Sequence, residues 1–280
     1  ITLTCTGTVQ AQKGTVFQRE FVWVDKSYIV IFDRVTALQS YYVKRWYLHT
    51  VLQPAMIGAQ TSAVSTTTNS LDARVECQIA NCSGASEWDG KEMSVLSSKS
   101  GWGVGGSGSK LFLRMLLPTD GKFRRRGGAG FENWVGTQNY PYAGSFPLTS
   151  YPEYEGRGEW RIEEETQGRL SDTFLNVLAI TNASVSSMPN TVLVSTSNMS
   201  GVHILGASLS YLILFSSDSS GAPVTSPVVY TVNITIPVRH LLFNMVPNTA
   251  YLISTRVIAE IMTVTVVQDN SGTISSAAGV

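Results

Sequence analysis

Hydrophobic residues along the chain occur in short runs that either alternate with polar residues or continue without a break. Alternation with period two is typical of half-buried strands, and short continuous runs such as "YIVIF" (28–32) and "LSYLILF" (209–215) are typical of buried ones. No segment shows the 3.6-residue period of an amphipathic helix. The pattern predicts strands over residues 15–24, 28–35, 41–52, 74–79, 111–117, 158–165, 173–180, 191–195, 201–205, 209–215, 228–236, 240–245, 250–254 and 256–268.

Many short strands separated by turn residues predict an all-β protein. We expect a large two-sheet antiparallel β-sandwich with little or no helix, in which residues 84–109 and 119–157 form long loops. A strand or arm over residues 1–14 is expected to precede a single sandwich domain over residues 15–280.

Composition narrows the classes of partner. The chain has 280 residues, of which 43% are hydrophobic and only 14% charged, and its formal net charge is zero. The absence of a basic excess argues against nucleic-acid binding. No apolar run approaches the roughly 18 residues of a transmembrane helix, so no membrane span is expected. The sequence begins with Ile1, which fits either a removed leader or a part of a longer chain.

The N-terminal segment "ITLTCTGTVQAQ" alternates apolar and hydroxyl side chains and therefore predicts a strand with one apolar face. Such a strand either pairs with the sheet edge of a neighbouring copy or completes its own sheet. With a net charge near zero, little repulsion opposes self-association. We therefore expect a homo-oligomer or polymer, with Cys5 available to link copies.

Two features agree with an extracellular or cell-surface location. Cys77 and Cys82 bracket "QIAN" and either form a disulfide in an oxidising compartment or remain reduced, buried thiols. Sequons place candidate glycosylation sites at Asn81, Asn182, Asn198 and Asn233, in a number only slightly above chance.

The glycine-rich "GWGVGG" (101–106) precedes a strand rather than a helix, which excludes dinucleotide binding. The basic cluster Arg124, Arg125 and Arg126 leads into an aromatic segment with Trp134 and Tyr140. Guanidinium groups beside aromatic rings suit carbohydrate or anionic sugars. The other interpretation is a solvated run of charges in a loop. The three histidines lie in strand patterns, which favours structural roles for His203 and His240.

Asp33 ends the buried run "YIVIF", where a carboxylate is costly unless it is paired, hydrogen-bonded or bound to a metal. If residues 28–35 and 42–50 formed a hairpin, Asp33 would face Arg45 as a cross-strand ion pair. In that register His49 is too far away to share a metal with Asp33.

A series of segments, in chain order, carries a family resemblance: "REFVWVDKSYIVIFDRV", "KRWYLH", "LFLRMLLP", "GGAGFENWVGTQNYP", "GEWRIEEE", "DTFLNVLAI", "RHLLFNMVPNTAYLI" and "NSGTIS". Together they resemble the C-terminal β-sandwich of heparinase II/III-like polysaccharide lyases over most of residues 15–275. The resemblance implies zinc ligands at Asp33 and His49, although the family's further upstream histidine has no counterpart here.

The catalytic helical toroid of that family, with its Tyr, His and Asn, has no counterpart in the sequence. We therefore expect a non-catalytic extracellular protein with a lyase-like fold that acts in self-assembly, as a surface or filament subunit, and contacts polysaccharide. One alternative is the C-terminal part of an active lyase that cleaves uronate glycans by β-elimination. Another is a carbohydrate-binding module.

Overall fold

A computed structural model describes residues 2–4, 13–50, 52–58, 84–88, 91–97, 108–127, 134–135, 138–139 and 160–276. The all-β prediction is confirmed, since these residues form strands and turns and no helix. Within the same residues no helix of the length and apolarity needed to cross a membrane occurs.

The strands form four principal sheets. Sheet A runs in the order β1 (Thr2–Thr4), β2 (Gly14–Val24), β3 (Tyr28–Ala37), β13 (Ser171–Asn182), β8 (Ser109–Leu117), β7 (Glu92–Ser97) and β5 (Ala55–Ile57). Sheet B contains β4 (Lys44–Thr50), β12 (Trp160–Thr166), β9 (Lys122–Gly127) and β6 (Gly84–Trp88). Sheet C contains β14 (Thr191–Ser195), β15 (Met199–Ile204), β16 (Ser210–Ser216) and β18 (Val238–Leu242). Sheet D contains β17 (Val228–Asn233), β20 (Ile261–Gln268), β19 (Ala250–Ile258) and β21 (Thr273–Ile274). A small separate hairpin joins β10 (Trp134–Val135) to β11 (Gln138–Asn139).

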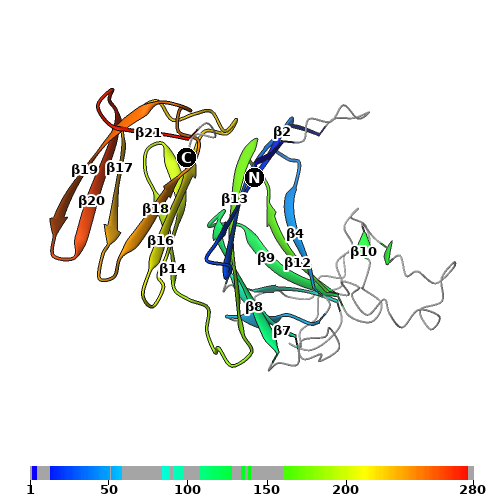
Figure 1. Cartoon of the computed structure of the whole chain (residues 1–280). Helices are drawn as coiled ribbons and strands as arrows, with labels where there is room; N and C mark the ends of the chain where they lie inside the picture. The colour runs from blue at the N-terminus through cyan, green and yellow to red at the C-terminus, as the bar shows by residue number, and fades with distance from the viewer. Residues whose placement is uncertain are drawn as a thin grey trace.

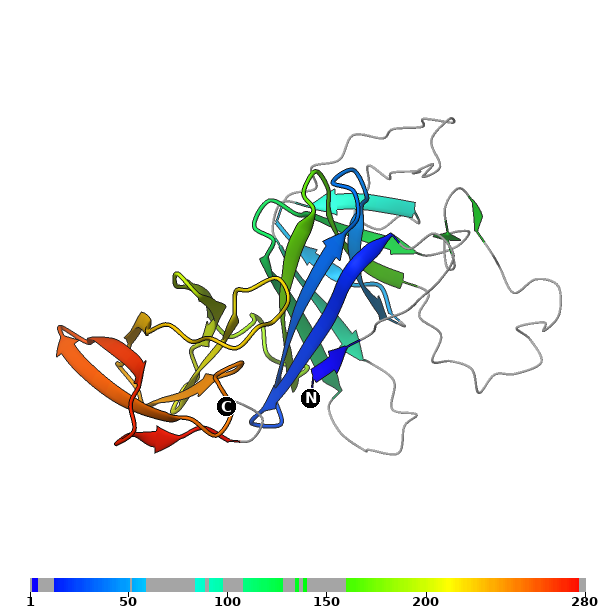
Figure 2. The same ribbon diagram turned by 90° about the horizontal axis from the view of Figure 1, so that it is seen from above.

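These sheets stack in the order B, A, C, D, so the structure has more layers than the two expected (Figure 1). Three hydrophobic clusters fill the three interfaces. Trp46 and Ile162 of sheet B pack with Phe174 of sheet A, and Phe32 of sheet A packs with Phe215 of sheet C. The third cluster joins sheets C and D and includes Leu214 and Val264, among others. Figure 2 shows the same layers from above.

Sheets A and C are covered on both faces, which explains their continuous apolar runs. In β3, Val30 and Phe32 face sheet C while Ile31 faces sheet B. In β16 every residue is buried, with Phe215 toward sheet A and Leu214 toward sheet D. A strand inside such a stack needs apolar residues at consecutive positions rather than at alternate ones.

A buried polar cluster joins sheets A and C. Arg34 of β3 donates to the Ser216 carbonyl of β16 at 2.6 Å and forms an ion pair with Glu20 at 3.1 Å. Asn244 accepts from Arg34 and from the Ser216 amide, and donates to Glu20 at 2.6 Å. The Arg34 guanidinium also lies 4.6 Å from the centre of the Phe32 ring. This cluster fixes the position of one sheet on the other through a network of charge-assisted hydrogen bonds.

Several expected strands differ in their boundaries or partners. β1 pairs with β2 of its own chain, which is the second of the two outcomes considered for the N-terminal segment. Residues 256–268 form a hairpin rather than one strand, because Ala259 and Glu260 adopt positive φ angles of 47° and 67° and reverse the chain. The strand expected over residues 74–79 lies outside the described residues.

Candidate functional site

Asp33 lies in the interface between sheets A and B and is paired with an arginine. Arg19 of β2, directly opposite in the register, donates from Nε and Nη2 to the two carboxylate oxygens at 2.7 and 2.6 Å. The Asp33 side chain is 1% exposed, and that of Arg19 is 34% exposed. Burial raises the pKa of Asp33, and the hydrogen bonds from Arg19 oppose this rise.

The expected hairpin of residues 28–35 and 42–50 is wrong, and with it the expected Asp33–Arg45 pair. β3 lies between β2 and β13 in sheet A, whereas β4 is an edge strand of sheet B. His49 is exposed on the outer face of sheet B, while Asp33 lies inside the stack. The structure therefore does not bring Asp33 and His49 together, and the described residues contain no group of three or more metal-ligating side chains.

Glu164 of β12 is a fully buried carboxyl in the same interface. Its Oε2 accepts from Asn176 Nδ2 at 2.8 Å. Its Oε1, Asn176 Oδ1 and the indole nitrogen of Trp46, which is directly opposite Glu164 on β4, make no hydrogen bond within the described part of the chain. Burial raises the pKa of Glu164 well above its usual value, and the negative charge of Asp33 adds to the rise. Sequence reasoning missed this site because Glu163, Glu164 and Glu165 resemble a solvated edge.

The outer face of sheet B carries a ladder of charges. The middle row consists of Arg161, Glu163 and Glu165 of β12. Strand pairing places Arg45, Tyr47 and His49 of β4 on one side of this row and Lys122, Arg124 and Arg126 of β9 on the other. We call these nine residues the sheet B outer face. Glu165 accepts from Arg45 at 2.7 Å and pairs with Arg124 at 2.9 Å. Glu163 accepts from Arg161 at 2.6 Å and pairs with Arg126 at 3.2 Å.

The structure corrects the expectation that a loop carries Arg124, Arg125 and Arg126. All three are buried residues of strand β9, with Arg124 and Arg126 on the outer face and Arg125 on the inner one. Arg125 donates to the Pro54 carbonyl at 2.8 Å, and its guanidinium lies 5.3 Å from the centre of the Trp160 ring. These buried arginines therefore do not form the exposed basic cluster expected from the sequence.

The accessible part of the sheet B outer face lies mainly on β4; on β12 the Arg161 side chain is 14% exposed, and Glu163 and Glu165 are buried. Tyr47 is 43% exposed, and His49 is also exposed. Arg161 stacks on Tyr47 with 4.9 Å between the guanidinium carbon and the ring centre. Burial raises the pKa of Tyr47, and the nearby Glu163 adds to the rise, so the hydroxyl remains a hydrogen-bond donor at neutral pH.

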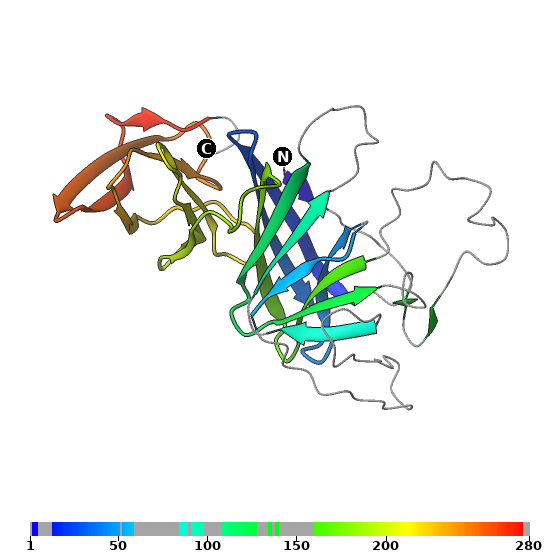
Figure 3. The same ribbon diagram turned by 90° about the horizontal axis from the view of Figure 1, so that it is seen from below.

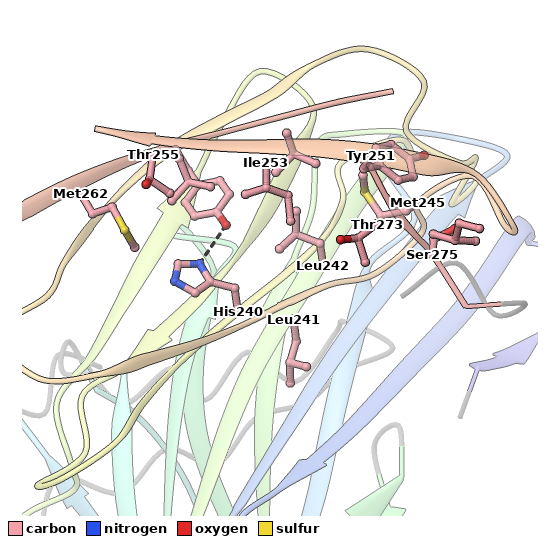
Figure 4. A pocket seen from close by; sticks show the side chains of 14 residues that line it. His240, Leu241, Leu242, Met245, Tyr251, Ile253, Thr255, Met262, Thr273 and Ser275 are labelled. Atoms are coloured by element: carbon pink, nitrogen blue, oxygen red, sulfur yellow. Dashed lines mark hydrogen bonds between the residues drawn. The ribbon is translucent and has the colours of Figure 1, made fainter. Parts of the chain in front are cut away.

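A cavity of about 400 Å³ lies between sheets C and D (Figure 4). At one end, Tyr230 of β17 and His240 of β18 share a hydrogen bond of 2.8 Å between the hydroxyl and Nδ1. Burial raises the pKa of Tyr230 and lowers that of His240, so both are neutral near pH 7. The remaining lining is largely apolar and includes Met262 and Ile253. Because its lining is neutral and largely apolar, the cavity suits an uncharged, apolar partner better than an acidic sugar.

The remaining predicted site residues are dispersed. Asn182 and Asn233 are exposed, and Asn198 uses its amide nitrogen to donate to Ser226 and Pro227. His203 is buried on sheet C. Trp134 belongs to β10, away from the principal sheets. Cys5, Cys77, Asn81, Cys82 and Tyr140 lie outside the described residues.

Comparison with known proteins does not assign the chain to a family. No protein-family model matches the chain, and no curated protein matches it.

Proposed function

We propose that this chain is a β-structured module that contacts acidic polysaccharide through the sheet B outer face. The supporting observation is the stack of Arg161 on the exposed Tyr47, with His49 and Arg45 on the same strand. The resemblance to heparinase II/III-like lyases favours a uronate glycan over other acidic polymers. An extracellular location follows from such a ligand.

The chemistry of this face fits sulfate or carboxylate groups on a sugar ring. Three basic residues of this face reach the surface: Lys122 is exposed, and Arg45 and Arg161 are partly exposed. The carboxylates of Glu163 and Glu165 are buried. A guanidinium group binds carboxylate or sulfate bidentately, and an aromatic ring offers a flat apolar surface to a sugar. The carboxylates of Glu163 and Glu165 accept from arginines and hold those guanidinium groups in place.

Self-assembly is a second candidate function, supported by an edge of sheet D. Beyond the two residues that pair with β21, β19 has no strand on its outer side among the described residues. An uncovered apolar edge is a template for another strand.

The glycan proposal is tested by titrating the full chain with size-defined heparin and with a neutral dextran, at low and at physiological salt. We expect heparin to bind with an affinity that falls as salt rises, because contacts between exposed charges are screened. Arg161→Gln should weaken binding by about tenfold or more, as expected for loss of a hydrogen bond to a charged group. Tyr47→Ala should weaken it several-fold through loss of stacking.

Arg239→Gln is the matched control, because Arg239 is an exposed arginine on sheet C. Unfolding midpoints of all variants separate a local loss of contact from a loss of fold. Equal heparin affinity for the wild type, Arg161→Gln and Tyr47→Ala contradicts the proposal. Release of unsaturated uronate, seen by ultraviolet absorbance, instead assigns the chain to an active lyase.

A further inference from the structure

Beyond Tyr251, no strand of the described part of the chain pairs with the outer edge of β19; we call this long, apolar and accessible edge the free edge of β19. β19 spans Ala250–Ile258, and only Ala250 and Tyr251 pair with β21 on the outer side. The following residues are unusually exposed for apolar side chains: Leu252 45%, Ile253 56%, Val257 55% and Ile258 58%. Figures 1 and 3 show β19 in the outermost layer of the stack, where the β19–β20 hairpin projects.

The backbone alternation of β19 determines which polar groups face outward. The Ala250 carbonyl accepts from Asp269 on the β20 side, and the Thr249 carbonyl accepts from Ser275 on the β21 side. Backbone groups in a strand point to alternate sides. The N–H and C=O groups of Ile253, Thr255 and Val257 therefore point to the free edge.

The pattern of apolar and polar residues along this edge is symmetric about Thr255. In an antiparallel pair of two β19 strands centred there, Leu252 lies opposite Ile258, Ile253 opposite Val257, and Ser254 opposite Arg256. Each apolar residue then meets an apolar residue of the other copy, and Arg256 meets a serine rather than a second arginine. A like-charge pair, which would destabilise the pairing, is avoided.

We propose that two copies of this chain join through the free edges of β19 in antiparallel register about Thr255. Ile253, Thr255 and Val257 of each copy exchange backbone hydrogen bonds with Val257, Thr255 and Ile253 of the other. Sheet D then continues across the two-fold axis into sheet D of the second copy. This inference rests on the self-assembly function proposed above and assigns it a surface.

The cavity between sheets C and D supports a second copy as the occupant. Ile253 and Thr255 line that cavity and belong to the free edge. In the proposed register, Val257 of the second copy lies opposite Ile253 on the same face. The two apolar side chains therefore pack together beside the cavity, which withdraws from water the side chains that are now exposed.

Thr255 gives the sharpest test, because the proposed two-fold axis pairs it with itself. Thr255→Glu and Thr255→Lys each place like charges directly opposite one another, so each variant alone should be monomeric. An equal mixture of the two variants places opposite charges together and should restore the dimer. Masses are measured by light scattering from low micromolar to several hundred micromolar protein, with the wild type measured in parallel.

Cysteine substitutions test the register. Directly opposite residues of a hydrogen-bonded pair lie about 5.5 Å apart between Cα atoms, within disulfide range. Thr255→Cys should therefore form a disulfide between copies, identified by peptide mass mapping. Ser254→Cys is the matched control, since the two introduced thiols would be offset by about 7 Å along the strands as well as by the strand spacing.

The outcomes separate this inference from the function on which it rests. A dimeric wild type with monomeric single variants and a dimeric mixture supports the β19 interface. A dimeric wild type whose Thr255→Glu and Thr255→Lys variants stay dimeric overturns the interface and leaves self-assembly through another surface. A wild type that is monomeric at all concentrations overturns both.

Discussion

The ion pair of Arg19 and Asp33 predicts unequal effects for the loss of its two members. Arg19→Met leaves Asp33, which is 1% exposed, as a buried carboxylate without the arginine that holds both its oxygens. Such a change costs about 3–5 kcal/mol of unfolding free energy at neutral pH. Asp33→Asn leaves Arg19, whose side chain is 34% exposed and can reach water. We therefore expect a smaller loss, about 1–2 kcal/mol.

The sign of the pH dependence follows from burial. Burial raises the pKa of Asp33, and Arg19→Met removes the hydrogen bonds that oppose the rise. A carboxyl with a raised folded-state pKa contributes full stability below its unfolded pKa, near 3.8, and loses it as pH rises through the folded pKa. The stability gap between Arg19→Met and the wild type should therefore shrink as pH falls from 7 toward 4.

Urea unfolding followed by the fluorescence of the six tryptophans measures these differences. The double variant Arg19→Met, Asp33→Leu should recover most of the loss, because apolar residues replace both charges together. The reasoning is refuted if Asp33→Asn costs as much as Arg19→Met, or if the gap does not change with pH. Stoichiometric zinc binding that is abolished by Asp33→Asn or by His49→Ala would restore the metal interpretation.

Two further predictions concern the other buried polar groups. Because the pKa of Glu164 is raised in the folded state, its contribution to the free energy of unfolding is full below about pH 4.5 and is lost as pH rises through the folded-state pKa. Glu164→Gln should therefore stabilise the chain at pH 7 by about 1–3 kcal/mol, with no gain at pH 4, in urea melts at both pH values. Arg34→Met should lower the unfolding free energy by about 3–5 kcal/mol, because it leaves the buried Glu20 carboxylate without a positive charge beside it, with the Asn244 amide as its remaining donor. An unfolding midpoint unchanged from the wild type for Arg34→Met would show that the contact between sheets A and C does not depend on this cluster.

Much of the strand content could be predicted, because the burial of a strand determines the local pattern of its hydrophobic residues. The strand expected over residues 191–195 has those bounds in β14, and β2 extends only one residue beyond its expected range. The number of layers could not be predicted this way. A continuous run such as "YLILF" shows that both faces are covered, but not which sheets cover them.

Charged strands were the main failure of the sequence interpretation. β9 was missed because Arg124, Arg125 and Arg126 have no apolar alternation, and their burial depends on carboxylates distant in the sequence. The partner of Asp33 was missed because residues 28–35 were paired with the following strand, residues 42–50, instead of the preceding one. A hairpin of β2 and β3 that turns at Asp25 and Lys26 places Arg19 of "REFV" directly opposite Asp33 of "FDRV".

Histidine footprinting tests the proposed glycan contact most directly. The chain has three histidines: His49 is exposed on the sheet B outer face, His203 is buried and His240 is half-buried beside Tyr230. Diethyl pyrocarbonate should modify His49 in the free chain, and saturating heparin should suppress that modification while that of His240 stays unchanged. Unchanged modification of His49 at saturating heparin, or protection of His240 alone, would contradict a glycan site on the sheet B outer face.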